Sequence, residues 1–370
     1  MAPWFRVDAL PAAVLLATAL VGCAGGDTGT AEQTPPGPAE SVPSAGVAGS
    51  LWVADEDGDS LTIVDTNTNA VTSTLTGIQA PHNVQVGRDA TLVYATSGDA
   101  DMVVAIDAET HAVTATARTG SHPAHVIEAP DGRVYVADSD DGTVSVFQGR
   151  NLQALGRIQL GGMPHGLRAA ADGSVIVDAN HMTGALDVID ARTGRAAFSV
   201  PVGEGPAQVA VSADGRHAYT GVTEPAAVVK VDLGTRTVVG RVTVSAAPVQ
   251  LYLTPDDTLV LSADQGTPDV PGHAASLIDT GTMSVRATVG TGAGPHGVVI
   301  DPGGRLGWVT NSYDDSVSVI DLAGQRVSAT IPVGEGPNGL SYSPRPPAAG
   351  PPTVALNLPA PEPSHQPGHR

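Results

Sequence analysis

Four histidines stand at equivalent places in a repeated segment of this chain, each one or two residues after a proline. They are His82, His125, His165 and His296. Imidazole nitrogen is a common protein ligand of zinc, copper and other transition metals. If the fold brings the four segments together, these side chains form the first coordination shell of a metal ion. The pattern therefore raises a metal site, with copper or zinc as the ion, as one interpretation of these histidines.

Two further histidines, His181 and His273, fall in loops that the repeat places on the same side, and we expect them behind the first shell. Met102, Met163 and Met182 lie in the same set of loops. Imidazole with thioether favours copper, whereas imidazole with carboxylate suits zinc. A structural role is also open, because in a Pro-His-Gly sequence the ring can cap a turn or hydrogen-bond a carbonyl.

The elements that position these histidines come from an internal repeat that opens with proline. Successive opening prolines are separated by 42, 41, 42, 42, 47 and 42 residues, and a bulky residue in the next strand keeps matching intervals. The prolines are Pro81, Pro123, Pro164, Pro206, Pro248, Pro295 and Pro337. A period of this size, filled with short strands and turn signals, is typical of a radially repeated all-β fold. Seven units predict seven blades.

The last full unit shows how one blade is written. Residues 295–300 and 307–311 are apolar strands, 317–321 alternates as a third strand, and 328–333 is the fourth. Antiparallel alternation puts the start of strand one, the end of strand two and the loop to strand three on one side. We call this side the top face. The opening prolines and their histidines then ring the axis at the top face.

The two ends of the repeat are out of phase, and this predicts how the ring closes. The first strand-like segment, 50–55, corresponds to a second strand, and its missing first strand is 338–342. One blade is then assembled from both termini, which leaves no unpaired radial edge. The predicted fold is an all-β, seven-bladed β-propeller with four antiparallel strands per blade.

Most of the acidic residues in the repeat have a structural explanation. Six third strands end in aspartate, which can accept bonds from amides two residues on and fix a turn. These residues are Asp65, Asp107, Asp190, Asp232, Asp279 and Asp321. The loops 55–59 and 138–142 superficially resemble calcium loops but lack the bidentate glutamate. We therefore expect both loops to be solvated turns.

Residues 49–345 resemble the YVTN-repeat, or YncE-like, propellers. The segment Trp308-Val309-Thr310-Asn311 is one conservative change from the name-giving motif, and Tyr135-Val136-Ala137-Asp138 is a looser match. The resemblance implies the seven-bladed architecture. It says little about activity, because one fold hosts many functions.

The amino-terminal residues 1–22 are typical of a lipoprotein signal peptide. An apolar stretch ends in Leu20-Val21-Gly22-Cys23, which resembles a lipobox, and Cys23 is the sole cysteine of the chain. We expect cleavage to leave a lipid-modified Cys23 that anchors the protein on the extracytoplasmic side of the cell membrane. An ordinary secretory peptide is the alternative. Residues 23–48 are expected to be a flexible tether, and the proline-rich tail, 346–370, to be disordered apart from a possible strand within 353–358.

The net charge of the chain and the absence of several catalytic motifs from its sequence narrow the range of possible functions. The formal charge of −20 argues against nucleic acid as a partner. Signatures of serine hydrolases, zinc proteases and P-loops are missing, and so is a haem-attachment motif. The favoured function is a binding scaffold that presents its top face to a protein, a cell-envelope glycan or a small ligand, and the sequence leaves open whether any reaction is catalysed. The alternative is a metal-dependent carrier or a hydrolase, lyase or lactonase with the histidine site.

Overall fold

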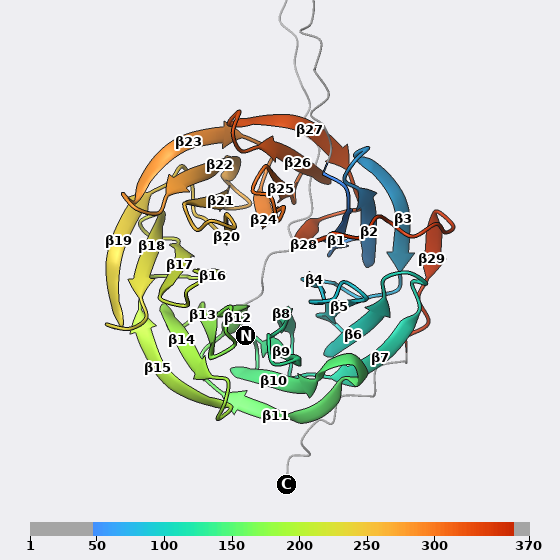
Figure 1. The fold of residues 1–370 in the computed structure, drawn as a ribbon, viewed down its shortest axis with the longest axis horizontal. Coiled ribbons are helices and arrows are strands. Elements are labelled where there is room, and N and C mark those ends of the chain that lie inside the picture. Colours follow the sequence, from blue (N-terminus) through green and yellow to red (C-terminus); the bar gives the residue numbers. More distant parts are fainter. Residues whose placement is uncertain (1–46, 359–370) are drawn as a thin grey trace, which may run out of the picture. The chain divides into compact units, whose positions relative to one another are not determined.

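Seven antiparallel sheets surround a common axis in the computed structural model, which describes residues 47–358 (Figure 1). Each sheet is one blade, and its first strand lies nearest the axis. The seven-bladed, all-β architecture that the repeat predicted is confirmed. No helix within the described range is long and apolar enough to cross a membrane. The signal peptide, the tether and the lipidation of Cys23 fall wholly or almost wholly outside these residues and stay predictions.

The strands of each blade follow one another along the chain. The shared blade contains β1 (Ser50–Asp55), β2 (Ser60–Asp65), β3 (Ala70–Thr76) and β28 (Pro337–Ser343). The next blade contains β4 (Val84–Val86), β5 (Leu92–Ser97), β6 (Met102–Asp107) and β7 (Val113–Arg118). The third contains β8 (Pro123–Glu128), β9 (Arg133–Asp138), β10 (Thr143–Gln148) and β11 (Gln153–Gln159), with a 3-10 turn at Gly149–Asn151.

The remaining four blades repeat the pattern. They begin with β12 (Pro164–Ala169), β13 (Val175–Asn180), β14 (Ala185–Asp190) and β15 (Arg195–Pro201). Then come β16 (Val209–Val211), β17 (His217–Val222), β18 (Ala227–Asp232) and β19 (Thr237–Thr243). They are followed by β20 (Gln250–Leu253), β21 (Leu259–Gly266), β22 (Pro271–Asp279) and β23 (Ser284–Gly290). The last full blade contains β24 (Pro295–Ile300), β25 (Leu306–Asn311), β26 (Ser316–Asp321) and β27 (Arg326–Pro332).

Apolar contacts between neighbouring blades make the core. The second and third strands are buried on both faces. Their sequences are therefore nearly continuous apolar runs and do not alternate between apolar and polar residues. Trp308 of β25, for example, is fully buried in a cluster with Leu51 of β1 and Leu340 of β28. Burying one such aliphatic side chain stabilises the fold by roughly 1.5–3 kcal/mol. Each blade is thus held by its neighbours.

The ring closes through strands from opposite ends of the chain. Strand β28 pairs with β1 in antiparallel register, with Leu51 opposite Tyr342 and Trp52 opposite Ser341. The predicted blade with strands from both termini is therefore confirmed. Beyond it, β29 (Thr353–Ala355) pairs in parallel with β3, and Val354 packs against the core of the shared blade. The strand that the sequence allowed within 353–358 is thus present at Thr353–Ala355, where apolar side chains cover the outer edge of the blade.

The turn aspartates behave as predicted. Oδ1 of Asp65 accepts from the amides of Asn67 at 2.8 Å and Thr68 at 3.2 Å, and each of the other five accepts from the amide three residues on. The expectation of solvated turns is wrong for Asp55 and Asp138, which are both 0% exposed. Strand alternation turns these two side chains inward, where hydroxyl groups of the next strand donate to Oδ2 of each carboxyl group.

Asp55 illustrates the arrangement and its energetic consequence. Its Oδ2 accepts from Ser60 at 3.0 Å and from Thr62 at 2.7 Å. Burial raises the pKa of Asp55 to about 6, although these hydrogen bonds oppose the shift. The folded state therefore takes up a proton at this carboxyl at a higher pH than the unfolded state does.

We expect the free energy of unfolding to gain from Asp55 as pH falls through about 6 toward about 4. In this window the folded protein holds the proton and the unfolded chain does not, so protonation favours folding, by up to roughly 3 kcal/mol. Urea unfolding of native protein and Asp55→Asn, at several pH values, measures the gain as a difference. The exposed Asp269→Asn is the matched control. A difference that is independent of pH would contradict the assignment.

Candidate metal-binding cluster on the propeller axis

The hub histidines are aimed at the axis by irregular pairing at the start of the innermost strands. In β12, Pro164 pairs with Asn180 but Gly166 pairs with Ala179, so His165 lies in a bulge. The register of β8 shifts across His125 and that of β24 across His296 in the same way. A bulge leaves one residue unpaired and redirects its side chain.

Two of these histidines are each followed by a glycine, and close packing explains why no larger residue stands there. A Cβ on Gly166 would lie 2.5 Å from the carbonyl oxygen of Ala207, and one on Gly297 would lie 2.3 Å from that of Asn338. The innermost strands of neighbouring blades therefore approach too closely for any side chain at these positions. This close approach is what brings the rings of adjacent blades together.

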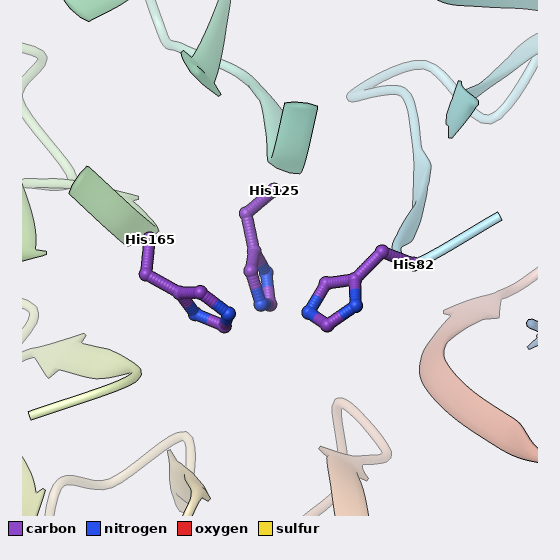
Figure 2. A group of neighbouring side chains, drawn as sticks. All are labelled: His82, His125 and His165. Carbon is purple, nitrogen blue, oxygen red and sulfur yellow. The ribbon is translucent and has the colours of Figure 1, made fainter. Parts of the chain in front are cut away.

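His82, His125 and His165 converge on one point (Figure 2). One ring nitrogen of each can be chosen so that all three lie within 4.8 Å of one another. Ring centroids are 5.5 Å apart for His82 and His125, 5.0 Å for His82 and His165, and 5.1 Å for His125 and His165. The three residues come from three consecutive blades.

The Nδ1 side of each ring is already engaged. Nδ1 of His82 lies 3.1 Å from Oε1 of Glu56, and Nδ1 of His165 donates to the carbonyl of Ala207 at 2.7 Å. Nδ1 of His125 contacts the side-chain amide of Gln208 at 3.1 Å. The Nε2 atoms of His82 and His125 are buried and have no hydrogen-bond partner within residues 47–358. Nε2 is thus the nitrogen that these two rings leave free.

The electrostatics of the cluster divide the histidines into two kinds. Burial alone would lower the pKa of His82, but the Glu56 carboxylate beside it outweighs burial and raises the pKa. Glu56 responds in turn: burial favours its neutral form, yet the contact with His82 lowers its pKa to about 2. Burial and the neighbouring rings hold the pKa of His125 and His165 well below its usual range. These two rings are neutral at pH 7, as a metal ligand must be.

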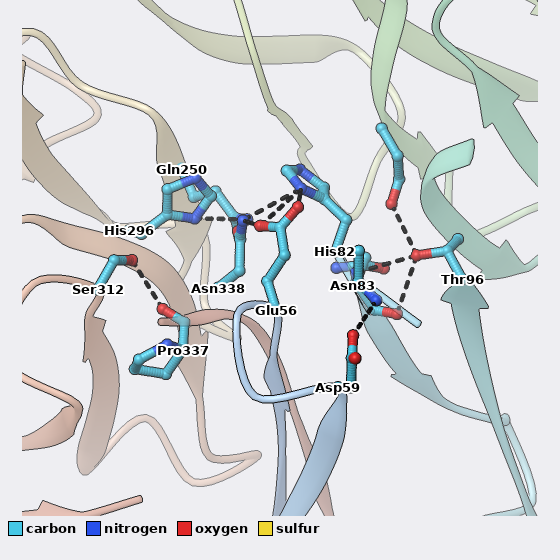
Figure 3. Close-up of polar contacts among 12 residues, drawn as sticks. Glu56, Asp59, His82, Asn83, Thr96, Gln250, His296, Ser312, Pro337 and Asn338 are labelled. Atoms are coloured by element: carbon cyan, nitrogen blue, oxygen red, sulfur yellow. Dashed lines mark hydrogen bonds and ion pairs between the residues drawn. The ribbon is translucent and has the colours of Figure 1, made fainter. Parts of the chain in front are cut away.

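His296 stands beside the group of three. Its ring centroid is 6.0 Å from that of His82, and its Nδ1 lies 3.4 Å from the amide of Gln250 (Figure 3). Burial, with the His82 charge, lowers the pKa of His296 to about 3. The same view shows Asn338 contacting both Glu56 and His82. His296 is therefore a neutral neighbour of His82 outside the closest triad.

The two predicted outer histidines differ in position. His181 follows β13, lines a surface pocket with Met182, and is near enough to His165 to affect its pKa. His273, on β22, is exposed and is not one of the grouped residues. Met182 is 72% exposed and Met102 is buried in β6. The sequence thus placed His181 beside the cluster.

Four polar residues of the cluster were not among the predicted site residues. Gln208, Gln250 and Asn338 occupy the histidine position of the repeat in their own blades, which is a signal that the sequence contains. Glu56 follows β1 in a loop that was expected to be a solvated turn, so no spacing related it to His82. Only the folded structure shows that contact.

Three imidazoles on one ion leave a coordination position open. In tetrahedral zinc sites Zn–N is about 2.0–2.1 Å, so ligand nitrogens are about 3.3 Å apart. The present separations, up to 4.8 Å, require each ring to move inward by about 1 Å. Rotation about side-chain bonds supplies such a shift. A bound ion would then keep a site for water or a ligand.

The fold and the axial rings define the class: a seven-bladed propeller with an imidazole cluster at its hub. Residues 81–257 match the family model described as YNCE-like beta-propeller, and the chain is a seven-bladed YncE-like propeller. No curated protein matches the sequence. The family assignment therefore rests on the repeat and the architecture and carries no reaction with it.

Solved structures with a similar fold come from several bacteria. Kuenenia stuttgartiensis hydrazine synthase is 21% identical, with 73% of this chain and 91% of that chain covered and a TM-score of 0.65. A functionally unknown protein from Desulfotomaculum acetoxidans is 13% identical, with 81% and 100% covered and a TM-score of 0.70. A candidate 6-phosphogluconolactonase from Bacteroides fragilis is 16% identical, with 83% and 99% covered and a TM-score of 0.68. At these identities the likeness shows the fold alone.

We expect Glu56→Gln to lower the pKa of His82 below its ordinary value. The neutral amide removes the charge that favours the imidazolium, and burial then dominates. NMR titration of the His82 ring nitrogens measures the shift. Glu335→Gln, an exposed change on the same face, is the control. An unaltered His82 titration in Glu56→Gln would show that the contact does not set this pKa.

Proposed function

We propose that the propeller binds a transition-metal ion, zinc or copper, on its axis through His82, His125 and His165. One observation carries the proposal: the free ring nitrogens of His82 and His125 are buried, unpartnered and directed at the same point as His165. A buried polar atom without a partner costs about 1–3 kcal/mol. A shared metal ion removes that cost at both atoms at once.

The structural alternative accounts for part of this arrangement. It expects a ring to hydrogen-bond a carbonyl, and His165 does so with Ala207. The same bond serves a metal site, because a ligating histidine usually donates its other nitrogen to a carbonyl or carboxylate. Glu56 performs that role for His82. Hydrogen bonding on the Nδ1 side therefore leaves the unpartnered Nε2 atoms unexplained without a ligand.

The donor set favours an ion that accepts nitrogen ligands and tolerates an open position. Imidazole suits zinc and copper alike. With three histidines, zinc would supply an acidified water or polarise a bound carbonyl. Glu56 and Asn338 hold the His82 ring, while Gln208 and Ala207 hold the other two. This supports a metal-dependent carrier or hydrolase.

A binding scaffold remains the second candidate, and exposed apolar residues favour it. Met182, Val270 and Tyr313 are 72%, 74% and 42% exposed, each in a loop between a second and a third strand. These loops lie on the top face, around the same end of the axis as the cluster. A protein or glycan that docks there would cover them and would not need the metal.

We expect protein purified without a metal-affinity tag to contain close to one zinc or copper ion per chain. His165→Ala should reduce the content at least tenfold, because it removes one of three ligands. Elemental analysis of dialysed protein measures this, and His273→Ala is the control on the same face. A metal-free native protein that also fails to bind added zinc or copper would leave the scaffold as the better account.

A further inference from the structure

We propose that Arg168 binds a small oxyanion, a carboxylate or a phosphate, near the propeller axis below the histidine cluster. Arg168 lies on β12, the innermost strand of its blade, three residues after His165. Strand residues advance about 3.3 Å each, so the two Cα atoms are about 10 Å apart along the strand. Arg168 is therefore deeper in the propeller than the rings and is not a member of the metal group.

The guanidinium group extends across a blade. Its Cζ lies 5.6 Å from the ring centroid of Tyr252, on the innermost strand β20 two blades further on. The intervening blade has Ala210 at the same repeat position, so no large side chain separates the two. Arg168 is partly exposed, although it lies on an innermost strand. Its side chain therefore reaches past the intervening innermost strand toward Tyr252 and keeps some contact with solvent.

No acidic group neutralises this charge. The one hydrogen bond of the side chain joins Nη1 to the carbonyl of Leu167 at 3.1 Å. Arg168 takes part in no ion pair among residues 47–358, in contrast to Arg133 or Arg157. A guanidinium has five N–H donors, and interior charges are normally paired. Most of the donors of Arg168 are thus left for a ligand.

A second donor lies beside the first. The Tyr252 hydroxyl makes no hydrogen bond to any residue that the structure describes, and the ring is partly exposed. A planar fork of N–H groups matches the two oxygens of a carboxylate or phosphate, and a hydroxyl can donate to either. The formal charge of the chain is −20, so this cation does not belong to a generally basic surface. The guanidinium group and the hydroxyl together therefore suit a small oxyanion as the ligand.

The test uses the full chain freed of metal, so that its outcome does not depend on the metal site. Inorganic phosphate and acetate are titrated by calorimetry into native protein and variants, in buffer without other oxyanions. We expect saturable binding of at least one anion, weakened at least tenfold in Arg168→Gln. Arg286→Gln, which removes an exposed arginine from the outer strand β23, should bind like native protein.

The conservative variant separates charge from geometry and covers a folding defect. Arg168→Lys keeps the charge and loses the fork, so its affinity should fall between those of native protein and Arg168→Gln. Circular dichroism confirms that each variant is folded. Two results would overturn the proposal: native protein that binds neither anion, or a folded Arg168 variant that binds as tightly as native protein when its fork is gone. Neither result bears on metal content.

Discussion

The pairing of β28 with β1 is the contact on which the rest depends. It joins segments from the two ends of the described chain and closes seven blades around one axis. Glu56 follows β1, and Asn338 is the second residue of β28, so closure brings both to His82. An open ring would leave Glu56 and His82 without Asn338, which contacts both. The chemistry at the hub is thus a consequence of closure.

The close approach of the innermost strands buries polar side chains, which costs free energy, and hydrogen bonds and an ion pair among these side chains offset that cost. Four imidazoles and a carboxylate are packed where water is largely excluded, and each polar group there costs free energy unless it is paired. Glu56 and His82 satisfy one another as an ion pair, and the other rings stay neutral. The Nε2 atoms of His82 and His125 and Oδ1 of Asn338 stay buried without a hydrogen-bond partner among residues 47–358. The proposed metal ion would account for the two ring nitrogens.

Much of the architecture could be predicted from the repeat, because prolines and turn aspartates recur at a fixed period. The opening histidines could be assigned to the axis for the same reason. Their grouping could not: His82, His125 and His165 come from consecutive blades, whereas His296 comes from further round the ring. Nor could Glu56 be found, since its loop has an ordinary turn composition. Asp55 was misjudged because composition does not reveal which side of a strand end faces inward.

The most direct test of the central claim is to locate the metal itself. Crystals of the native protein grown with equimolar zinc, measured above and below the zinc absorption edge, would show its position by anomalous scattering. The account predicts one strong peak on the propeller axis, about 2.0–2.1 Å from one nitrogen each of His82, His125 and His165. No peak at the hub, with the three rings still apart, would contradict it.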